Sequence, residues 1–162
     1  MMRIATGALL LVTAVISAAA QDVPRGFPVD QTFKGISISG FDVQKSGLTL
    51  TVTRDRAANL VRGAGSAGCN NWTATFIFRD DTQMDVSDVV TTKKACPKPR
   101  MTTEDAFLTT LRSVHRWRTD GNKLILEGEA GRLLMTSGNT IGDKKPQKKS
   151  DKKPAGSPQA SS

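Results

Sequence analysis

The stretch RWRTDGNKLILEGEAGRLLMT, residues 116–136, decides the fold class. It holds three short runs separated by two turns, at residues 120–122 and 128–131. In the middle run Leu124 and Leu126 lie two residues apart, so they share one face of a strand. Short turns that contain Asp-Gly or Gly between such runs are typical of β-hairpins. The stretch therefore predicts an antiparallel meander.

Further strands are predicted upstream, at residues 32–39, 47–54, 59–65, 73–78 and 84–90. The clearest lies at residues 47–54, where Leu48, Leu50 and Val52 alternate with threonines. This period of two places apolar side chains on one face and hydroxyl groups on the other. The pattern indicates a sheet with one face against a core.

One helix is predicted, with Thr102 or Thr103 as its N-cap, because Pro97 and Pro99 should prevent an earlier start. Glu104 and Asp105 would then lie in the first turn, where the helix dipole favours negative charge. The apolar stripe of this helix consists of Phe107, Leu108, Leu111 and Val114. Together the elements predict a single α+β domain, in which a strongly curved antiparallel sheet of about seven or eight short strands packs around one helix.

The two ends of the chain differ in composition from this domain. Residues 1–20 combine Arg3, an apolar run and the small residues before Gln21, which is typical of a secretory signal peptide cleaved near Ala20–Gln21. A leader at residues 21–30 precedes the domain at residues 31–141, and residues 142–162 are predicted to be a disordered basic tail with six lysines and two aspartates. We therefore expect an exported, periplasmic or secreted protein that is soluble after cleavage and has no transmembrane segment.

Cys69 and Cys96 are the two cysteines of the chain. Export exposes a protein to oxidising conditions, in which two cysteines are more often paired than free. They do not form a Cys-x-x-Cys motif, which argues against a thioredoxin-like redox role. The sequence predicts a structural Cys69–Cys96 disulfide.

A family resemblance emerges around these cysteines. The run Gly68-Cys69-Asn70-Asn71-Trp72-Thr73-Ala74-Thr75-Phe76 is similar to the Gly-Cys-Asn signature of META domains, the HslJ-like family of bacterial envelope proteins. The run Thr91-Thr92-Lys93-Lys94-Ala95-Cys96, a following helix and then Gly121-Asn122-Lys123-Leu124 also resemble that family, in the same order. The resemblance covers residues 31–137 and implies a bent sheet around one helix, in an envelope setting linked to stress response and drug tolerance. It implies no established catalytic residues.

Candidate residues for catalysis or metal binding are few. His115 is the one histidine and lies near three arginines, so a capping or surface role is expected rather than catalysis. Asp80, Asp81, Asp85 and Asp88 are candidates for calcium binding, but the spacing of a calcium loop is absent. Glu127 and Glu129 lack a second feature of a glycosidase. We therefore expect no enzyme activity, no metal and no cofactor.

Binding is the function that the sequence favours. Trp72, Phe76, Gly65 and Gly68 are predicted to form a binding surface, because glycine permits close approach and an aromatic side chain can anchor a partner. An envelope protein or an apolar or anionic envelope ligand is the expected partner. Nucleic acid is not, because aromatic and basic residues do not alternate as on a base-stacking surface, despite the net charge of +8. The first alternative is a small disulfide-bonded inhibitor of an exported hydrolase. The second, which the sequence favours less, is an uncharacterised enzyme.

Overall fold

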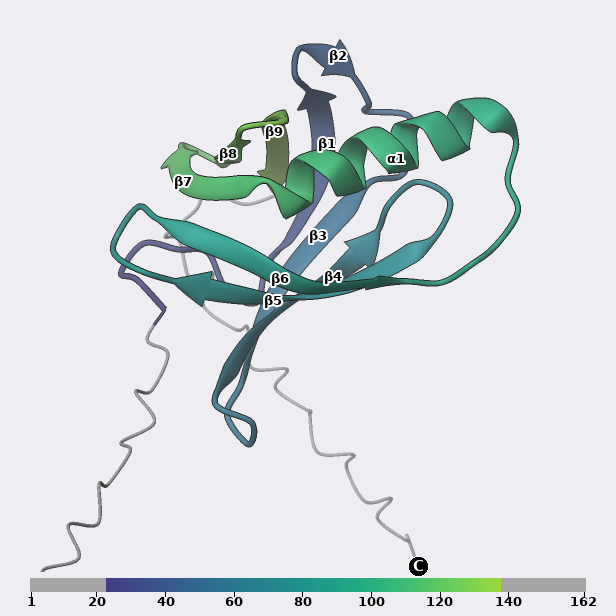
Figure 1. Ribbon diagram of the computed structural model, residues 1–162. Coiled ribbons are helices and arrows are strands. Elements are labelled where there is room, and N and C mark those ends of the chain that lie inside the picture. The colour runs from purple at the N-terminus through teal and green to yellow at the C-terminus, as the bar shows by residue number, and fades with distance from the viewer. Residues whose placement is uncertain (1–22, 138–162) are drawn as a thin grey trace, which may run out of the picture.

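The computed structural model describes residues 23–137. The elements are β1 (Thr32–Ile38), β2 (Phe41–Asp42), β3 (Thr49–Asp55), β4 (Leu60–Ser66), β5 (Asn71–Phe78), β6 (Met84–Thr91), α1 (Lys98–Arg112), β7 (Val114–Asp120), β8 (Lys123–Gly128) and β9 (Gly131–Ser137). All strand pairs are antiparallel, and α1 lies across the curved sheet (Figure 1). The predicted fold class is confirmed.

The sheet runs in the order β6-β5-β4-β3-β1-β9-β8-β7, with β2 paired to β1 outside this path. The two end strands are β6 and β7. They approach each other just before the start of β6, where the Trp117 backbone N–H donates to the Thr82 carbonyl oxygen at 2.9 Å. An isolated bridge between Gln83 and Arg116 lies beside that bond. The sheet is therefore nearly closed, and α1 contacts β6, β8, β9 and β1 across the remaining opening.

Most of the predicted strands agree with the structure to within one or two residues. The sheet has nine strands within residues 23–137, rather than seven or eight. The strand that the sequence did not reveal is β2, which is two residues long and carries no alternating pattern. It forms a small hairpin with β1 through the pairs Ser37–Asp42 and Ile38–Phe41.

The predicted helix start is wrong. The helix begins at Lys98, with Pro97 as its N-cap and Pro99 in its first turn. Proline is tolerated there because the first N–H groups of a helix have no intrahelical acceptor to bond. Thr102 and Thr103 therefore lie inside the helix, where their hydroxyl groups donate back to the carbonyl oxygens four residues earlier, at 3.1 Å each.

The apolar stripe of the helix is confirmed. Phe107, Leu108 and Leu111 are buried, and Phe107 packs against Trp72 with the ring centroids 5.5 Å apart. Val114 is also buried, but it begins β7 rather than extending the helix. These contacts join the helix to the inner face of the sheet.

The segment before β1 was predicted to be a leader outside the domain, and the structure places part of it in the core. Phe27 is buried, and its ring centroid lies 4.7 Å from that of Phe78 and 4.8 Å from that of Trp117. Because these two partners come from β5 and β7, Phe27 joins strands from both end regions of the sheet. The predicted signal peptide and basic tail lie outside the described residues.

Candidate functional site

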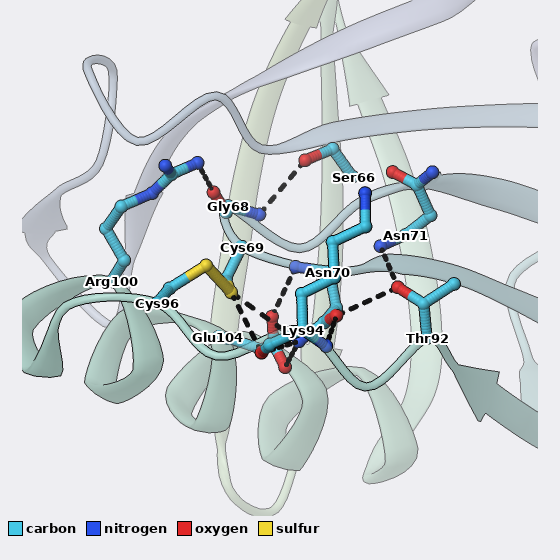
Figure 2. Close-up of a disulfide and its surroundings, with 10 residues drawn as sticks. All are labelled: Ser66, Gly68, Cys69, Asn70, Asn71, Thr92, Lys94, Cys96, Arg100 and Glu104. Carbon is cyan, nitrogen blue, oxygen red and sulfur yellow. Dashed lines mark hydrogen bonds between the residues drawn. A yellow bond between two sulfur atoms is a disulfide. The ribbon is translucent and has the colours of Figure 1, made fainter.

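Asn70 is the centre of a buried hydrogen-bond network at the start of β5 (Figure 2). Its backbone N–H donates to the Glu104 Oε2 atom at 2.6 Å, and its Nδ2 atom donates to Glu104 Oε1 at 2.9 Å. Its Oδ1 atom accepts from the Lys94 backbone N–H at 2.7 Å and from the Thr92 hydroxyl group at 2.8 Å. One amide side chain therefore links β5, the segment after β6 and the helix.

The predicted disulfide between Cys69 and Cys96 is confirmed next to this network, with a Cα–Cα distance of 6.1 Å (Figure 2). The Arg100 guanidinium group donates to the Gly68 carbonyl oxygen on the same side of the helix. We call the Asn70–Glu104 contacts, the disulfide and this arginine bond the clamp. Its two buried polar side chains, Asn70 and Glu104, both have hydrogen-bond partners, which is the usual condition of a structural element.

The structure places the two aromatic side chains of the predicted binding surface at Trp72, Phe76, Gly65 and Gly68 in the core, with Gly68 buried and Gly65 partly buried. Trp72 and Phe76 are 1% and 0% exposed. A Cβ atom on Gly65 would lie 2.0 Å from the Thr49 carbonyl oxygen. The close approach that glycine permits is made by the chain's own β3 strand, and the aromatic side chains fill the core.

Three of the four candidate calcium-binding aspartates, Asp80, Asp85 and Asp88, have structural partners. Asp80 accepts from the backbone N–H groups of Thr82 and Gln83 at 2.8 and 2.7 Å, and these bonds lower the pKa of Asp80. Asp85 forms an ion pair with Arg79. Asp88 is exposed, with a positive φ of 51° in the irregular part of β6. These contacts explain the aspartates as parts of a turn and a strand.

The remaining titratable candidates are dispersed. His115 is exposed on β7. Glu127 forms ion pairs with Arg132 at 3.1 Å and Arg118 at 3.7 Å, while Glu129 is exposed in the following turn. Among residues 23–137, no three His, Cys, Asp or Glu side chains are grouped so that they could hold a metal ion.

A groove that the sequence did not reveal lies between α1 and the β1–β2 hairpin. It has a volume of about 650 Å³ and is open to solvent on one side. Its lining consists mainly of apolar and small side chains: Ile38, Ser39, Phe41, Asp42, Val43, Thr102, Thr103, Asp105, Ala106, Thr109, Thr110 and Ala130. Phe41 is 77% exposed, which is the largest exposure of any bulky apolar side chain in residues 23–137.

Two features of the sequence point to this groove in retrospect. Thr102, Ala106 and Thr109 recur at helical spacing on the side of α1 away from the apolar stripe. Phe41 follows a turn and precedes Asp42, so its isolation among polar residues is visible in the sequence. What the sequence could not show is that the hairpin lies beside this face of the helix.

The charges of the groove are of one sign. Asp42 and Asp105 are the charged residues of its lining, which contains no lysine or arginine. Asp42 also accepts a hydrogen bond from the Gln44 backbone N–H at 2.8 Å, which holds its carboxylate in the turn. Because no cation lines the groove, it is electrostatically unsuited to an anionic ligand.

Comparison with known proteins gives a family and a fold. Residues 29–140 match the model of the META domain family. The chain is similar to a solved NMR structure of a protein from Burkholderia xenovorans, with a TM-score of 0.51 and 17% identity over 79% of this chain and 98% of that chain. Comparison with curated proteins returned no match.

These comparisons confirm the predicted resemblance and support the observed architecture. They do not favour the alternative of a hydrolase inhibitor. Among the described residues, no helix is both long and apolar enough to cross a membrane.

Proposed function

The chain belongs to the META domain family, and on that premise we propose that it is an exported, non-enzymatic binding module of the cell envelope. Its site is the groove between α1 and the β1–β2 hairpin. Its ligand is an uncharged or cationic molecule with an apolar part. The observation that carries the proposal is an open apolar groove with Phe41 exposed at its edge.

The dimensions and lining of the groove support this site. Small-molecule sites commonly have volumes of about 300–1,000 Å³, are mostly apolar and carry a few polar groups. This groove has a volume of about 650 Å³ and combines apolar residues with two carboxylates. The carboxylates of Asp42 and Asp105 favour a cationic or neutral group over an anionic one.

The proposed absence of catalysis is supported by what the polar side chains do. Glu104 binds Asn70, Asp80 stabilises a turn and Glu127 pairs with two arginines. A catalytic acid or base must be free to reach a substrate. The partners of these three carboxylates support structural roles for them, and this supports the proposal that the groove acts by binding.

Export is supported by the sequence of residues 1–20 and by the disulfide, since disulfides persist mainly in oxidising compartments. We predict that the protein recovered from the producing cell begins at Gln21. Intact mass and N-terminal sequencing measure this directly. A chain that retains Met1 in a reducing cytoplasm would contradict export. The proposal that the groove binds a ligand would not be affected.

The groove is tested with a neutral fluorescent probe, N-phenyl-1-naphthylamine, whose emission rises in an apolar site. We predict saturable binding by the wild type and at least a tenfold loss for Ala106→Trp, because Ala106 lines the groove and is exposed, so the larger side chain fills the space. The control is Ala64→Trp, since Ala64 is exposed on β4 and is not part of the lining. Equal binding by both variants would exclude the groove.

The stress role follows from the same site. A binding module that removes apolar cations from the envelope would protect the cell from amphiphilic compounds. Survival of a strain carrying Ala106→Trp under a cationic amphiphile should then fall relative to a strain carrying Ala64→Trp. Equal survival, with the probe result intact, would reject the stress role alone.

A further inference from the structure

The segment from Lys93 to Arg100 concentrates positive charge at one place on the surface. Lys93, Lys94, Lys98 and Arg100 lie within eight residues, all four are exposed, and no acidic residue falls between them. We call these four residues the basic segment. Among residues 23–137, none of the four forms an ion pair, whereas Arg62, Arg79, Arg118 and Arg132 do. The four cations of the basic segment are therefore not held in ion pairs with other described residues.

The clamp holds this segment in one conformation. The disulfide fixes Cys96, and Asn70 binds the Lys94 backbone on both sides, accepting from its N–H at 2.7 Å and donating to its carbonyl oxygen at 3.4 Å. Figure 2 shows the side chains of Lys94 and Arg100 on either side of the disulfide. Glu104, the acidic side chain inside the clamp, is buried and bound by Asn70, and none of the ion pairs of residues 23–137 joins it to these cations.

An exposed apolar side chain precedes these cations in the chain. Val90 is 63% exposed near the end of β6, three residues before Lys93. It is paired with Thr73, which is also exposed, so it lies on the outer face of the sheet. Exposed cations beside an exposed apolar side chain match a bilayer interface, where lipid phosphates meet acyl chains.

We propose that the basic segment and Val90 form a docking surface for the anionic lipid bilayer of the envelope. Clusters of lysine and arginine are attracted to anionic lipids, each residue near the surface adding about a fivefold factor to binding. The six lysines of residues 142–162 add charge of the same sign. The occupant differs from that of the groove, whose charged lining is acidic.

This inference depends on the proposed export in one respect: export determines which bilayer the protein meets. It extends the proposed function, because a domain held at the bilayer would bind apolar ligands where they partition. Vesicle binding in vitro depends on neither export nor the groove. The variant Ala106→Trp should retain vesicle binding, so failure of one proposal is distinguishable from failure of the other.

The test is sedimentation of the full processed chain with vesicles of phosphatidylcholine, with and without one third phosphatidylglycerol. We predict binding to the anionic vesicles and none to the neutral ones, with a steep decrease between about 0.05 M and about 0.5 M salt because the attraction is screened. The variant K93Q/K94Q/K98Q should bind about 100-fold more weakly, since three cations are lost.

The control variant K34Q/R54Q/K123Q loses the same charge from exposed residues outside the basic segment. It should stay within about threefold of the wild type, because distant charges are screened. Thermal melting of both variants checks the fold, which should be unchanged since the substituted side chains form no hydrogen bonds in residues 23–137. A second arm, Val90→Ser, should weaken binding several-fold at every salt concentration.

Three outcomes would overturn the proposal. If both triple variants lost vesicle binding equally, binding would depend on the net charge of the protein and not on the basic segment. Binding would be assigned to the tail if replacing its six lysines by glutamine abolished vesicle binding while K93Q/K94Q/K98Q did not weaken it. Binding to soluble polyphosphate without binding to anionic vesicles would identify a polyanion rather than a bilayer as the partner.

Discussion

Asn70 shows how much of the fold a single residue can determine. It is 2% exposed, and its side chain and backbone together form hydrogen bonds to the segment that follows β6 and to the helix. The acceptor Glu104 comes from 34 residues further along the chain. The Gly-Cys-Asn motif therefore specifies a long-range junction, beside which the disulfide forms.

Replacement of Asn70 by alanine should lower the free energy of unfolding by about 2–3 kcal/mol, because the buried Glu104 carboxylate loses a donor. The neighbouring Asn71 is exposed, and Asn71→Ala should cost less than about 0.5 kcal/mol. Urea denaturation of both variants measures the difference. Similar small losses at both positions would show that Asn70 does not organise the junction.

Residue types predicted the disulfide correctly, but they did not indicate that the aromatic residues of the predicted binding surface are buried. The predicted export and the presence of two cysteines were enough to predict the disulfide, because pairing needs no knowledge of the fold. Burial depends on which strands and helices pack together: Trp72 lies opposite Gly65 in the sheet and packs on Phe107 from the helix. A sequence pattern does not show that a distant element covers an aromatic side chain.

At the scale of elements, the helix has two faces with different roles. Phe107, Leu108 and Leu111 pack into the core, and Thr102, Ala106 and Thr109 line the groove. The first face was predicted from its apolar period. The second consists of small residues, which a hydrophobic pattern does not distinguish from an ordinary solvent-exposed face.

Leu111→Ala should reduce the free energy of unfolding by about 2–5 kcal/mol, since Leu111 is fully buried and its removal leaves a cavity. Arg112→Ala should cost little, because Arg112 is exposed and is the last residue of the helix. Thermal and urea unfolding of both variants provide the comparison. Comparable losses would mean that the buried face of the helix is assigned incorrectly.

The strand pattern predicted eight of the nine strands because alternation with a period of two is a local property. It missed β2, whose two residues are too few to alternate. The helix start was misjudged for another local reason. Proline blocks a helix interior but not its first turn, so Pro99 did not mark the boundary that it suggested.

At the scale of the whole molecule, the sheet is completed by contacts between distant segments. Phe27 packs on Phe78 and Trp117, and the backbone of Trp117 bonds to Thr82. None of these contacts follows from local periodicity, which explains why the residues before β1 were predicted to be a leader. The groove has the same origin, since it forms only when the β1–β2 hairpin lies beside α1.

The molecule presents surfaces of opposite charge for different occupants. The groove carries Asp42 and Asp105 and suits an apolar ligand without negative charge, while the basic segment suits an anionic bilayer. The groove lining and the basic segment share no residue, so the two proposals can be tested by separate substitutions. Binding in the groove is the central claim of this interpretation.

The most direct test of that claim is an NMR titration of the ¹⁵N-labelled protein with N-phenyl-1-naphthylamine. We predict that amide shifts change at Phe41, Ala106 and Ala130, which lie on three different segments around the groove. The shifts of the Trp72 indole N–H, which donates to the Thr49 carbonyl oxygen inside the fold, should stay constant. Changes centred on Trp72 and Cys69, with none at the groove, would contradict the assignment.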